Sequence, residues 1–474
     1  MNQFNQFLNK TKEYGTIVNL NPPLYYAEGL PTARLNEIIY GENGFIGYVI
    51  KIRPNLITIL ALNEYLAGRE EKIARSDQEI QINVGEKLLG TVINPLGQPF
   101  FAGTTLPALS ESRPIDSKPL GLIHRKKISR PFVTGVGLVD LLVPLGKGQR
   151  ELVVGDRKTG KSAFVLTTAL TQAKNNNIVI YACIGKKNND ILNVIEFFKE
   201  NKIEKQTVIV ATSASCPLGL THLAPLSAVT IAEYFKDQGN DVTLILDDLS
   251  IHAKVHREIY LTAKFFPGRE SYPGDIFHLH AKLLERAGSF IHPKKGETAI
   301  TCLPIAQTIE GDLTGYITTN LMGMTDGHIF FDNQLFTLGR RPSVNVHLSV
   351  TRVGKQTRTH LQRKLHEELM KKLTLYETLR SYAHFGSELS SEVREKISQG
   401  EEIYELFQQS VKEILTEETA LAIWGMIHTR NKKNKTIPQL KNILAQKQFQ
   451  QKLLDILKTD DLDKYLQSVD KLKI

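Results

Sequence analysis

The stretch Gly155–Ser162, which reads GDRKTGKS, contains the residue types that a phosphate-binding loop needs. It matches the pattern G-x-x-x-x-G-K-[ST], in which the glycines let backbone amides point at phosphate oxygens. Lys161 can reach the β and γ phosphates, and the Ser162 hydroxyl can bind magnesium. A strand-like ELVV precedes the stretch and a helix-like segment follows it, as this chemistry requires. The predicted nucleotide-binding residues of this stretch are Gly155, Asp156, Arg157, Lys158, Thr159, Gly160, Lys161, Ser162 and Ala163.

A second acidic feature lies at the end of the apolar run VTLILDD, which closes on Asp247 and Asp248. A carboxylate at the end of such a strand can hold magnesium through a water molecule. For a single Asp, a solvent-facing strand end is the ordinary alternative. We predict Ser162 and, through water, Asp247 as the residues that hold Mg²⁺.

The residues after the apolar run IVIYACIG bear on whether bound nucleotide is hydrolysed. Hydrolysis needs a group that orients the attacking water, often a carboxylate or Gln. The run is followed by KKNNDIL, so Lys186 and Lys187 stand at the position where such a group is sought. An ammonium group cannot accept a proton from water at neutral pH, and Asp190, the nearest acid, comes several residues later. The local pattern favours binding over hydrolysis.

Arg352 follows a short apolar run and stands near a Gly in LSVTRVGK. An arginine so placed can stabilise negative charge on a γ-phosphate, often one bound to a neighbouring subunit. A surface salt bridge is the alternative interpretation.

Histidines form a further cluster in the sequence, with His252 and His256 four residues apart and His278 and His280 following. The Glu of the zinc motif H-E-x-x-H is absent. We expect no metal site at these histidines.

The elements that must position these residues change in type along the chain. From about 15 to 95, short β-branched runs alternate with turns and predict a small barrel or sandwich. From Thr134 to about Gly354, strands that are apolar on both faces alternate with helix-length segments and predict a covered parallel sheet. After about Gln356 the periodicity is helical. The expected domains are a β-barrel domain at 1–95, a nucleotide-binding P-loop α/β domain with its leading linker at 96–355, and an α-helical domain at 356–474.

The composition is that of an ordinary globular protein, with 474 residues, 41% of them hydrophobic and 23% charged. The net charge is +9, but the basic residues are dispersed and carry no RNA-binding signature. We therefore expect no nucleic-acid partner. No apolar run approaches the roughly 18 residues that span a bilayer, and the polar start has no signal core. A cytosolic protein is expected.

Several long blocks of the sequence resemble the alpha subunit of F-type ATP synthases and ATPases, from about Gly15 to Gln409 and more weakly beyond. The blocks are GTVINPLGQP, VTGVGLVDLLVPLGKGQRELVVGDRKTGKSA, LDDLSIHAKVHRE, PGRESYPGDIFHLHAKLLERAG, IEGDLTGYITTNLMGMTDGHIFFDNQLFTLGRRPSVNVHLSVTRVG and FGSELSSEVREKISQG. The variant GDRxTGK and the block PGRESYPGD are similar to alpha and not to the catalytic beta subunit. The expected fold is thus a multidomain chain with an N-terminal β-barrel, a central RecA-like P-loop α/β domain with a mostly parallel sheet, and a C-terminal α-helical domain.

The resemblance implies a six-membered ring in which alpha chains alternate with catalytic beta chains around a gamma-type central stalk. In that family, alpha binds ATP or ADP with Mg²⁺ without turning it over. The resemblance further implies that Arg352 reaches the catalytic site of the adjacent beta chain as an arginine finger. Phe336, Arg341 and Pro342 match positions that line the alpha nucleotide pocket, and Gln409 matches one of two adenine-side glutamines. The expected location is cytoplasmic and peripheral, at the inner face of the cell membrane through the complex.

Three departures from the family pattern keep alternatives open. Lys186 stands where alpha typically has Gln and beta a carboxylate, Val411 replaces the second adenine-side glutamine, and only about fourteen residues precede Gly15. One alternative is an alpha-type subunit of a specialised ATPase that drives a motility or cytoskeletal machine instead of ion transport. Another, disfavoured by Lys186, is a self-sufficient homohexameric export ATPase or RNA translocase. Peripheral-stalk or motility-machine proteins are accordingly possible partners.

Overall fold

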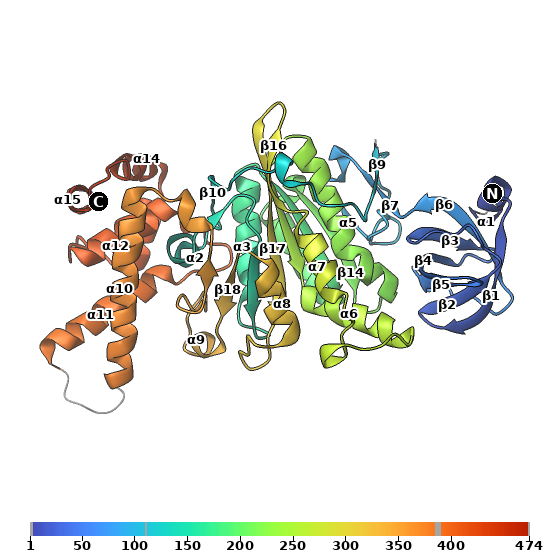
Figure 1. Ribbon diagram of the computed structural model, residues 1–474. Coiled ribbons are helices and arrows are strands. Elements are labelled where there is room, and N and C mark those ends of the chain that lie inside the picture. Colours follow the sequence, from blue (N-terminus) through green and yellow to red (C-terminus); the bar gives the residue numbers. More distant parts are fainter. Residues whose placement is uncertain (1–2, 110, 384–389, 473–474) are drawn as a thin grey trace. The chain divides into compact units, whose positions relative to one another are not determined.

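The computed structural model describes residues 3–109, 111–383 and 390–472 (Figure 1). The part of the block FGSELSSEVREKISQG before Ser390 thus falls outside these ranges. The chain forms two compact units, which are described separately. The first unit contains 1–126, 176–307 and 313–325, and the second contains 127–175, 308–312 and 326–474. The borders of the three expected domains remain predictions.

The first unit begins with a short helix and a closed six-stranded barrel, as expected from the β-branched runs (Figure 1). Neighbours around the barrel follow the order β1-β2-β5-β4-β3-β6, and β6 closes it by pairing antiparallel with β1. Alternate side chains, among them Ile17, Ile39 and Ile59, fill the interior with no exposed surface. The elements are α1 (Gln3–Thr11), β1 (Tyr14–Asn21), β2 (Leu24–Glu28), β3 (Glu37–Gly41), β4 (Ile46–Arg53), β5 (Leu56–Ala61) and β6 (Lys72–Glu79).

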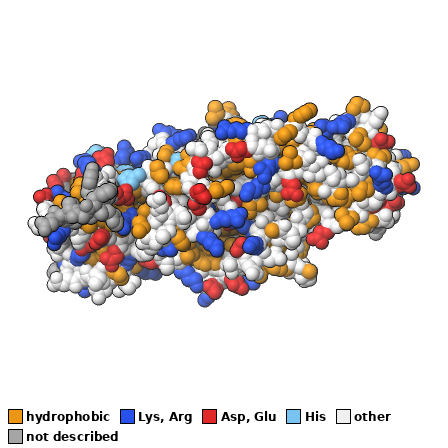
Figure 2. Space-filling model, turned by 90° about the horizontal axis from the view of Figure 1, so that it is seen from below, with side chains coloured by type: hydrophobic (Ala, Val, Ile, Leu, Met, Phe, Trp, Pro, Cys, Tyr) orange, Lys and Arg blue, Asp and Glu red, His pale blue; other side chains and the backbone are white. Residues whose placement is uncertain are grey.

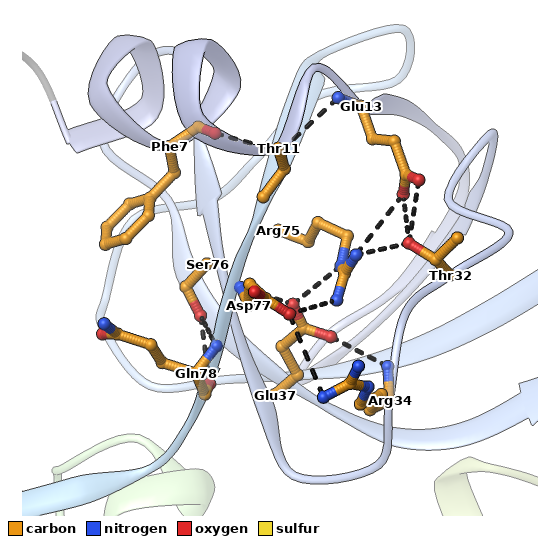
Figure 3. Close-up of polar contacts among 10 residues, drawn as sticks. All are labelled: Phe7, Thr11, Glu13, Thr32, Arg34, Glu37, Arg75, Ser76, Asp77 and Gln78. Carbon is orange, nitrogen blue, oxygen red and sulfur yellow. Dashed lines mark hydrogen bonds and ion pairs between the residues drawn. The ribbon is translucent and has the colours of Figure 1, made fainter.

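A buried arginine ties the barrel strands together (Figure 3). The Nε of Arg75 donates to Glu37 Oε1 at 2.8 Å, and its Nη2 donates to Asp77 Oδ1 at 3.0 Å. Thr32 accepts from Arg75 Nη1, and Glu13 lies 3.8 Å from the same nitrogen. The charge of a buried arginine must be balanced, so its contacts with these acids hold β3, β6 and the residues just before β1 in one arrangement.

The first unit also contains a parallel sheet in the order β17-β15-β13-β14-β8, with β16 antiparallel on β17. Its strands are nearly all buried on both faces, because α4, α5 and α6 pack against them. The elements are β8 (Val92–Ile93), β13 (Ile178–Lys186), α4 (Asn188–Glu200), β14 (Thr207–Ser213), α5 (Leu218–Asp237), β15 (Val242–Asp247), α6 (Leu249–Thr262), α7 (Ile276–Leu284), β16 (Gly288–His292), β17 (Gly296–Gln307) and α8 (Tyr316–Met324).

One strand expected in the barrel belongs to this sheet. β8, from the run LLGTVINPLG, pairs in parallel with β14 through Ile209↔Val92 and Val210↔Ile93. Between the barrel and β8, β7 (Gln81–Val84) pairs antiparallel with β9 (Glu111–Pro114). Turn signals show where a strand ends but not which strand it pairs with, and β8 is too short for its own pattern to choose.

The second unit contains the remaining strands. β12 (Glu151–Gly155) and β18 (Gly327–Phe331) are parallel, and β19 (Val350–Thr351) pairs antiparallel with β18. β10 (Pro131–Phe132) and β11 (Leu145–Gly146) form a two-stranded sheet. The helices close to these strands in the sequence are α2 (Gly137–Leu142), α3 (Lys161–Lys174) and α9 (Asn333–Thr337).

Helices make up the rest of the second unit, as the periodicity predicts. Trp424 of α12 is buried, with 1% of its surface exposed, and packs inside this helical part. α11 ends at Phe407, so the helix does not continue through the segment QQSVKEIL, which carries helical periodicity in the sequence. The helices are α10 (His360–Ala383), α11 (Ser391–Phe407), α12 (Glu417–His428), α13 (Ile437–Leu444), α14 (Lys447–Ile456) and α15 (Leu462–Asp470).

On the face shown in Figure 2, Lys and Arg side chains are interspersed with acidic and apolar ones. None of the helices in the described ranges has the length and apolar character needed to cross a membrane.

Candidate functional site

The phosphate-binding loop lies in the second unit, between β12 and α3. The β12 residues are fully buried, and α3 begins at Lys161 directly after Gly160. Gly160 has a φ of 98°, and Gly155 has a φ of 153° with Phe331 O only 2.3 Å from the place of a Cβ. Both positions therefore require glycine, which explains the two fixed glycines of the motif.

Backbone and side-chain bonds hold this loop in shape. Asp156 Oδ1 accepts hydrogen bonds from Thr308 Oγ1 at 2.6 Å and from Gly311 N at 2.9 Å. Thr159 is buried and donates to Asp156 O at 2.8 Å, while its own carbonyl accepts from Ser343 Oγ at 2.6 Å. Asp156 and Thr159, which stand between the two motif glycines, thus shape the loop. The other residues between these glycines are the ones available to contact phosphate directly.

The cationic side chains of the loop fall into two groups. Lys161 is buried, and its Nζ donates to Gly155 O at 2.6 Å and to Asp156 O. Arg157 and Lys158 are exposed, as is the side chain of Ser162 at the start of α3. The positive end of α3 and these cations are suited to phosphate groups.

A cavity of about 290 Å³ lies beside the loop within the second unit. Five of the predicted nucleotide-binding residues line it: Gly160, Ala163, Arg341, Pro342 and Gln409. Its wall also includes Val136, Phe164, Thr167, Ser343, Ser410 and Val411. The first group comes from segments far apart in the sequence, which the fold brings to one place.

Gln409 and Arg341 are fixed by bonds to the backbone. Gln409 Nε2 donates to Gly135 O at 2.9 Å, and its Oε1 accepts from Gly137 N at 2.9 Å. The Arg341 guanidinium lies 3.5 Å from the centroid of the Phe336 ring and donates to Phe336 O at 2.8 Å. Phe336 therefore supports Arg341 from outside the lining of the cavity. Gln409 shapes the wall through its backbone bonds.

The residues lining the cavity that were not singled out in the sequence follow two patterns. Phe164 and Thr167 lie three and six residues after Lys161, so the helical repeat of α3 could have indicated one of its faces. Val136, Ser343 and Ser410 come from loops, where no periodicity reports which side chain faces a cavity.

The acidic strand end lies in the first unit, where β15 ends at Asp247. Lys186 Nζ lies 2.5 Å from Asp247 Oδ1 and 3.9 Å from Asp248 Oδ2. Tyr181 Oη donates to Asp247 Oδ2 at 2.9 Å. Asp248 accepts from Ile251 N at 2.8 Å, which caps α6, and from Gln307 Nε2 at 2.6 Å.

At this strand end one ammonium, that of Lys186, faces the two carboxylates of Asp247 and Asp248. Burial lowers the pKa of Lys186, but Asp247 and Asp248 outweigh burial and raise the pKa above its ordinary value. The ammonium therefore stays charged and pairs with Asp247. Both oxygens of Asp247 are engaged, so the residues at this strand end, as arranged, do not fit a hydrated metal ion.

Arg352 lies directly after β19 in the second unit, with an exposed side chain. Its backbone N donates to Asp326 O at 3.0 Å. Asp326 in turn accepts from Arg150 N at 2.9 Å, Nε at 3.0 Å and Nη2 at 2.7 Å. A two-pronged contact of this kind fixes geometry as well as charge. It anchors the segment from which Arg352 projects.

The histidines of the first unit form a stack that the sequence pattern only partly indicates. His222, which was not singled out, lies between His252 and His256 with ring centroids 5.2 and 5.3 Å away. His252 Nδ1 lies 3.0 Å from His280 Nε2. Within the described ranges, no three His, Cys, Asp or Glu side chains are arranged to hold a metal ion.

Comparisons with known proteins extend these observations. The family model for the ATP synthase alpha/beta family, nucleotide-binding domain, matches residues 135–351, and that for the ATP synthase alpha/beta chain, C terminal domain, matches 358–473. A curated relative from Clostridium acetobutylicum, named ATP synthase subunit alpha, is 36% identical over 88% of this chain and 83% of its own. A relative of the same name from Mycoplasmoides gallisepticum is 36% identical over 98% of this chain and 89% of its own.

Proposed function

The chain belongs to the ATP synthase alpha/beta family as a member of the alpha type, and we propose that it is a non-catalytic, ATP-binding subunit of a rotary ATPase ring. In this proposal it binds ATP or ADP at its own phosphate loop and supplies Arg352 to the catalytic site of an adjacent beta-type chain. Nucleotide binding is the family property, whereas the division of labour is the part to be tested.

The loop and cavity of the second unit support nucleotide binding. The loop presents a helix start, two glycines with positive φ and clustered cations, which suit phosphate groups. Apolar side chains such as Val136, Phe164 and Val411 line the adjoining cavity beside polar ones, and this apolar part of the wall suits a flat base. The exposed hydroxyl of Ser162 is the group of this chain that would contact magnesium accompanying the nucleotide.

The single observation that carries the non-catalytic role is the position of Lys186. It stands directly after Gly185, where a water-orienting carboxylate would be needed, and its ammonium is paired with Asp247. Asp190, the nearest acid in the sequence, lies in the first turn of α4 with an exposed side chain. Neither residue is suited to activate water for attack on a γ-phosphate.

Arg352 supports the proposed role in a neighbouring chain. Its exposed side chain extends from an anchored segment, which is the arrangement an arginine needs in order to reach a phosphate bound elsewhere. In the proposal, beta-type and gamma-type subunits are its partners and the complex lies at the inner face of the cell membrane, which this chain contacts only indirectly.

The decisive experiment measures phosphate release by the chain alone and with the beta-type chain of the same organism. We expect ATP binding without turnover for the chain alone and turnover for the mixture. Arg352→Ala should lower the turnover of the mixture by about 10³-fold or more, because an arginine finger contributes on that order. Arg53→Ala, which removes an exposed arginine of the barrel, is the matched control and should leave turnover unchanged.

Steady phosphate release by the chain alone would contradict the proposal and favour a self-sufficient ring. A specialised ring that drives a motility or cytoskeletal machine is the second candidate, and the departure at Lys186 is the observation that favours it. Purification of the native complex separates these two, since one predicts membrane-ring and stalk subunits and the other cytoskeletal or membrane-anchored proteins.

A further inference from the structure

We propose that a cavity in the first unit binds a small alkyl diammonium ion through the Tyr48 hydroxyl and the carboxylates of Glu79 and Asp275. The cavity has a volume of about 210 Å³ and is lined by the barrel, α5 and α7. All the residues that line it belong to the first unit, whereas the phosphate loop belongs to the second. The inference therefore goes beyond the proposed function and does not depend on it.

Tyr48 of β4 brings a hydroxyl group to this cavity. Its neighbour Val49 packs inside the barrel, and side chains alternate along a strand, so Tyr48 lies on the outer face of β4. The residue is nevertheless only 3% exposed. Within the described ranges its hydroxyl takes part in no hydrogen bond, although a buried hydroxyl normally has a partner. An enclosed hydroxyl of this kind is available to a ligand.

His222 of α5 lines the same cavity and has a second polar group without a partner. Its Nδ1 is buried and makes no hydrogen bond to any described residue. Burial, reinforced by the neighbouring histidines, lowers the pKa of His222, so the ring is neutral and one of its nitrogens can accept a hydrogen bond. A hydroxyl and a neutral imidazole at one cavity favour a ligand that carries N–H donors.

The charged side chains of the cavity favour a cation. Among the described residues that line it, Lys282 is the one lysine or arginine, and its Nζ pairs with Asp116 Oδ1. Asp116 Oδ2 also accepts from Asn36 Nδ2 at 3.2 Å. Glu79 and Asp275 therefore remain without a lysine or arginine partner within the described ranges. Two such carboxylates match a ligand with two positive charges.

Asp275 keeps its charge although it is partly buried. Burial raises its pKa, but hydrogen bonds with His256 and Tyr260 outweigh burial and lower the pKa below the ordinary value. His256 Nε2 lies 3.1 Å from Asp275 Oδ1, and Tyr260 Oη donates to Oδ2. These two contacts also fix the direction of the carboxylate on the wall of the cavity.

The rest of the wall suits a short methylene chain. Apolar side chains such as Ile80, Leu226 and Leu279 line it beside the polar groups. The chain as a whole has a net charge of +9 and repels cations at long range, so binding of a dication would report a local site.

Calorimetric titration of 1,4-diaminobutane into the full chain without nucleotide, at about pH 8, where both amines are charged, tests the inference. We expect saturable binding with a Kd of about 1 mM or tighter, and no binding of the neutral analogue 1,4-butanediol. Tyr48→Phe removes a buried hydroxyl that contacts a charged group and should weaken binding by about tenfold. Glu79→Gln removes an exposed carboxylate, which solvent screens, and should weaken it by about threefold.

Tyr26→Phe and Glu28→Gln are the matched controls, because both positions lie on β2 of the barrel and neither lines the cavity. Both variants should bind as the wild type does. No saturable binding of 1,4-diaminobutane, or equal binding of 1,4-butanediol, overturns the inference. An unchanged Kd in Tyr48→Phe and Glu79→Gln, or a weaker one in the controls, shows that the ion binds elsewhere and also overturns it. Should Tyr48→Phe fail to fold, Glu79→Gln and the comparison with 1,4-butanediol decide.

Discussion

Asp247 and Asp248 are adjacent in the sequence and of the same type, but their side chains make different contacts. The side chain of Asp247 pairs with Lys186, whereas that of Asp248 caps α6 and accepts the Gln307 amide. The pattern of two acids does not say which contacts each carboxylate makes, because the partners Lys186 and Gln307 lie far from both in the sequence. The partner that decides the role of Asp247 is 61 residues earlier in the chain, on the adjacent strand.

The histidine stack of the first unit couples its stability to pH. His252 and His280 are buried, and His222 stacks on His252 and His256. Burial, reinforced by the neighbouring histidines, lowers the pKa of His222, His252 and His280, and that of His252 falls from 6.5 to about 4. Asp275 is the acid that faces the stack. Its Oδ1 lies 3.1 Å from His256 Nε2.

We predict that the chain loses stability as the pH falls from 6.5 towards about 4. A histidine whose pKa is depressed in the folded chain takes up protons more readily when unfolded, so its contribution is intact above pH 6.5 and is lost below it. For His252 the loss amounts to about 3 kcal/mol, at about 1.4 kcal/mol for each pH unit. The free energy of unfolding, measured in urea across this pH range, checks the prediction.

A substitution distinguishes the effect of the histidine stack on stability from general acid denaturation. His252→Asn should reduce the fall in the free energy of unfolding by roughly 1 kcal/mol or more, since one titrating group is removed. His124→Asn changes an exposed histidine and should leave the pH profile as it is. An identical profile for the wild type and His252→Asn would refute the link to this residue.

The candidate site could be predicted from the sequence where a motif has a fixed spacing. Gly155 and Gly160 have positive φ, a conformation that glycine adopts readily and that the motif predicts. Lys161 begins α3 as expected. The cavity wall was anticipated at Arg341, Pro342 and Gln409 only through the family resemblance. Contacts made by loops depend on how distant segments meet, which local pattern does not encode. The roles of these residues in binding stay predictions.

At the scale of elements, the contact between α10 and α11 depends on one glycine. Gly400 lies within α11 and is buried against Tyr376 of α10. A Cβ at this position would lie 2.2 Å from Tyr376 Cδ2, which is closer than real side-chain contacts allow. The glycine therefore permits close approach of the two helices at a place where any larger residue would separate them.

We predict that Gly400→Ala lowers the free energy of unfolding by about 1 to 3 kcal/mol, because the added methyl forces a ring or a helix to shift. Without the clash, alanine would instead stabilise a helix relative to glycine. Gly323→Ala provides that comparison, since a Cβ at Gly323 of α8 meets nothing within 4 Å. Thermal unfolding of the two variants should show a decrease for the first and no decrease for the second.

Elements with strong local signals were predictable and those set by tertiary contacts were not. Fully apolar runs gave β12, β13, β14 and β15, and helical periodicity gave α10. The partner of β8 and the end of α11 at Phe407 were not anticipated. After Phe407 the backbone N of Gln409 donates to Arg341 O, so a contact 68 residues away in the chain replaces the next helical bond.

At the scale of the whole molecule, the proposed chemistry is divided between chains. The contacts that hold Arg352 in this chain would therefore affect turnover by the whole ring. β18 and β19 pair antiparallel, and Asp326 precedes β18 while Arg352 follows β19. The Asp326 carboxylate binds Arg150, and its carbonyl accepts from Arg352 N. In the proposed ring, the path of the segment that carries the arginine thus depends on contacts made within this chain.

We predict that Asp326→Ala lowers the kcat of the ring formed with the beta-type chain by about 10- to 100-fold and leaves its KM for ATP nearly unchanged. Loss of the carboxylate releases Arg150 and loosens the segment that carries Arg352, and a displacement on the order of 1 Å can cost about 100-fold in rate. ATP binding by the chain alone should stay as in the wild type. Asp463→Ala, at an exposed position of α15, is the control.

A double substitution tests whether Asp326 acts through Arg352 or through general stability. If its effect is transmitted by the arginine, Asp326→Ala combined with Arg352→Ala should be no slower than Arg352→Ala alone, because residues that act as a unit are not additive. A further loss in the double variant, or a loss of ATP binding by the isolated chain, would assign Asp326 to the stability of the second unit. Unchanged turnover for Asp326→Ala would show that the segment holds Arg352 in place without this carboxylate.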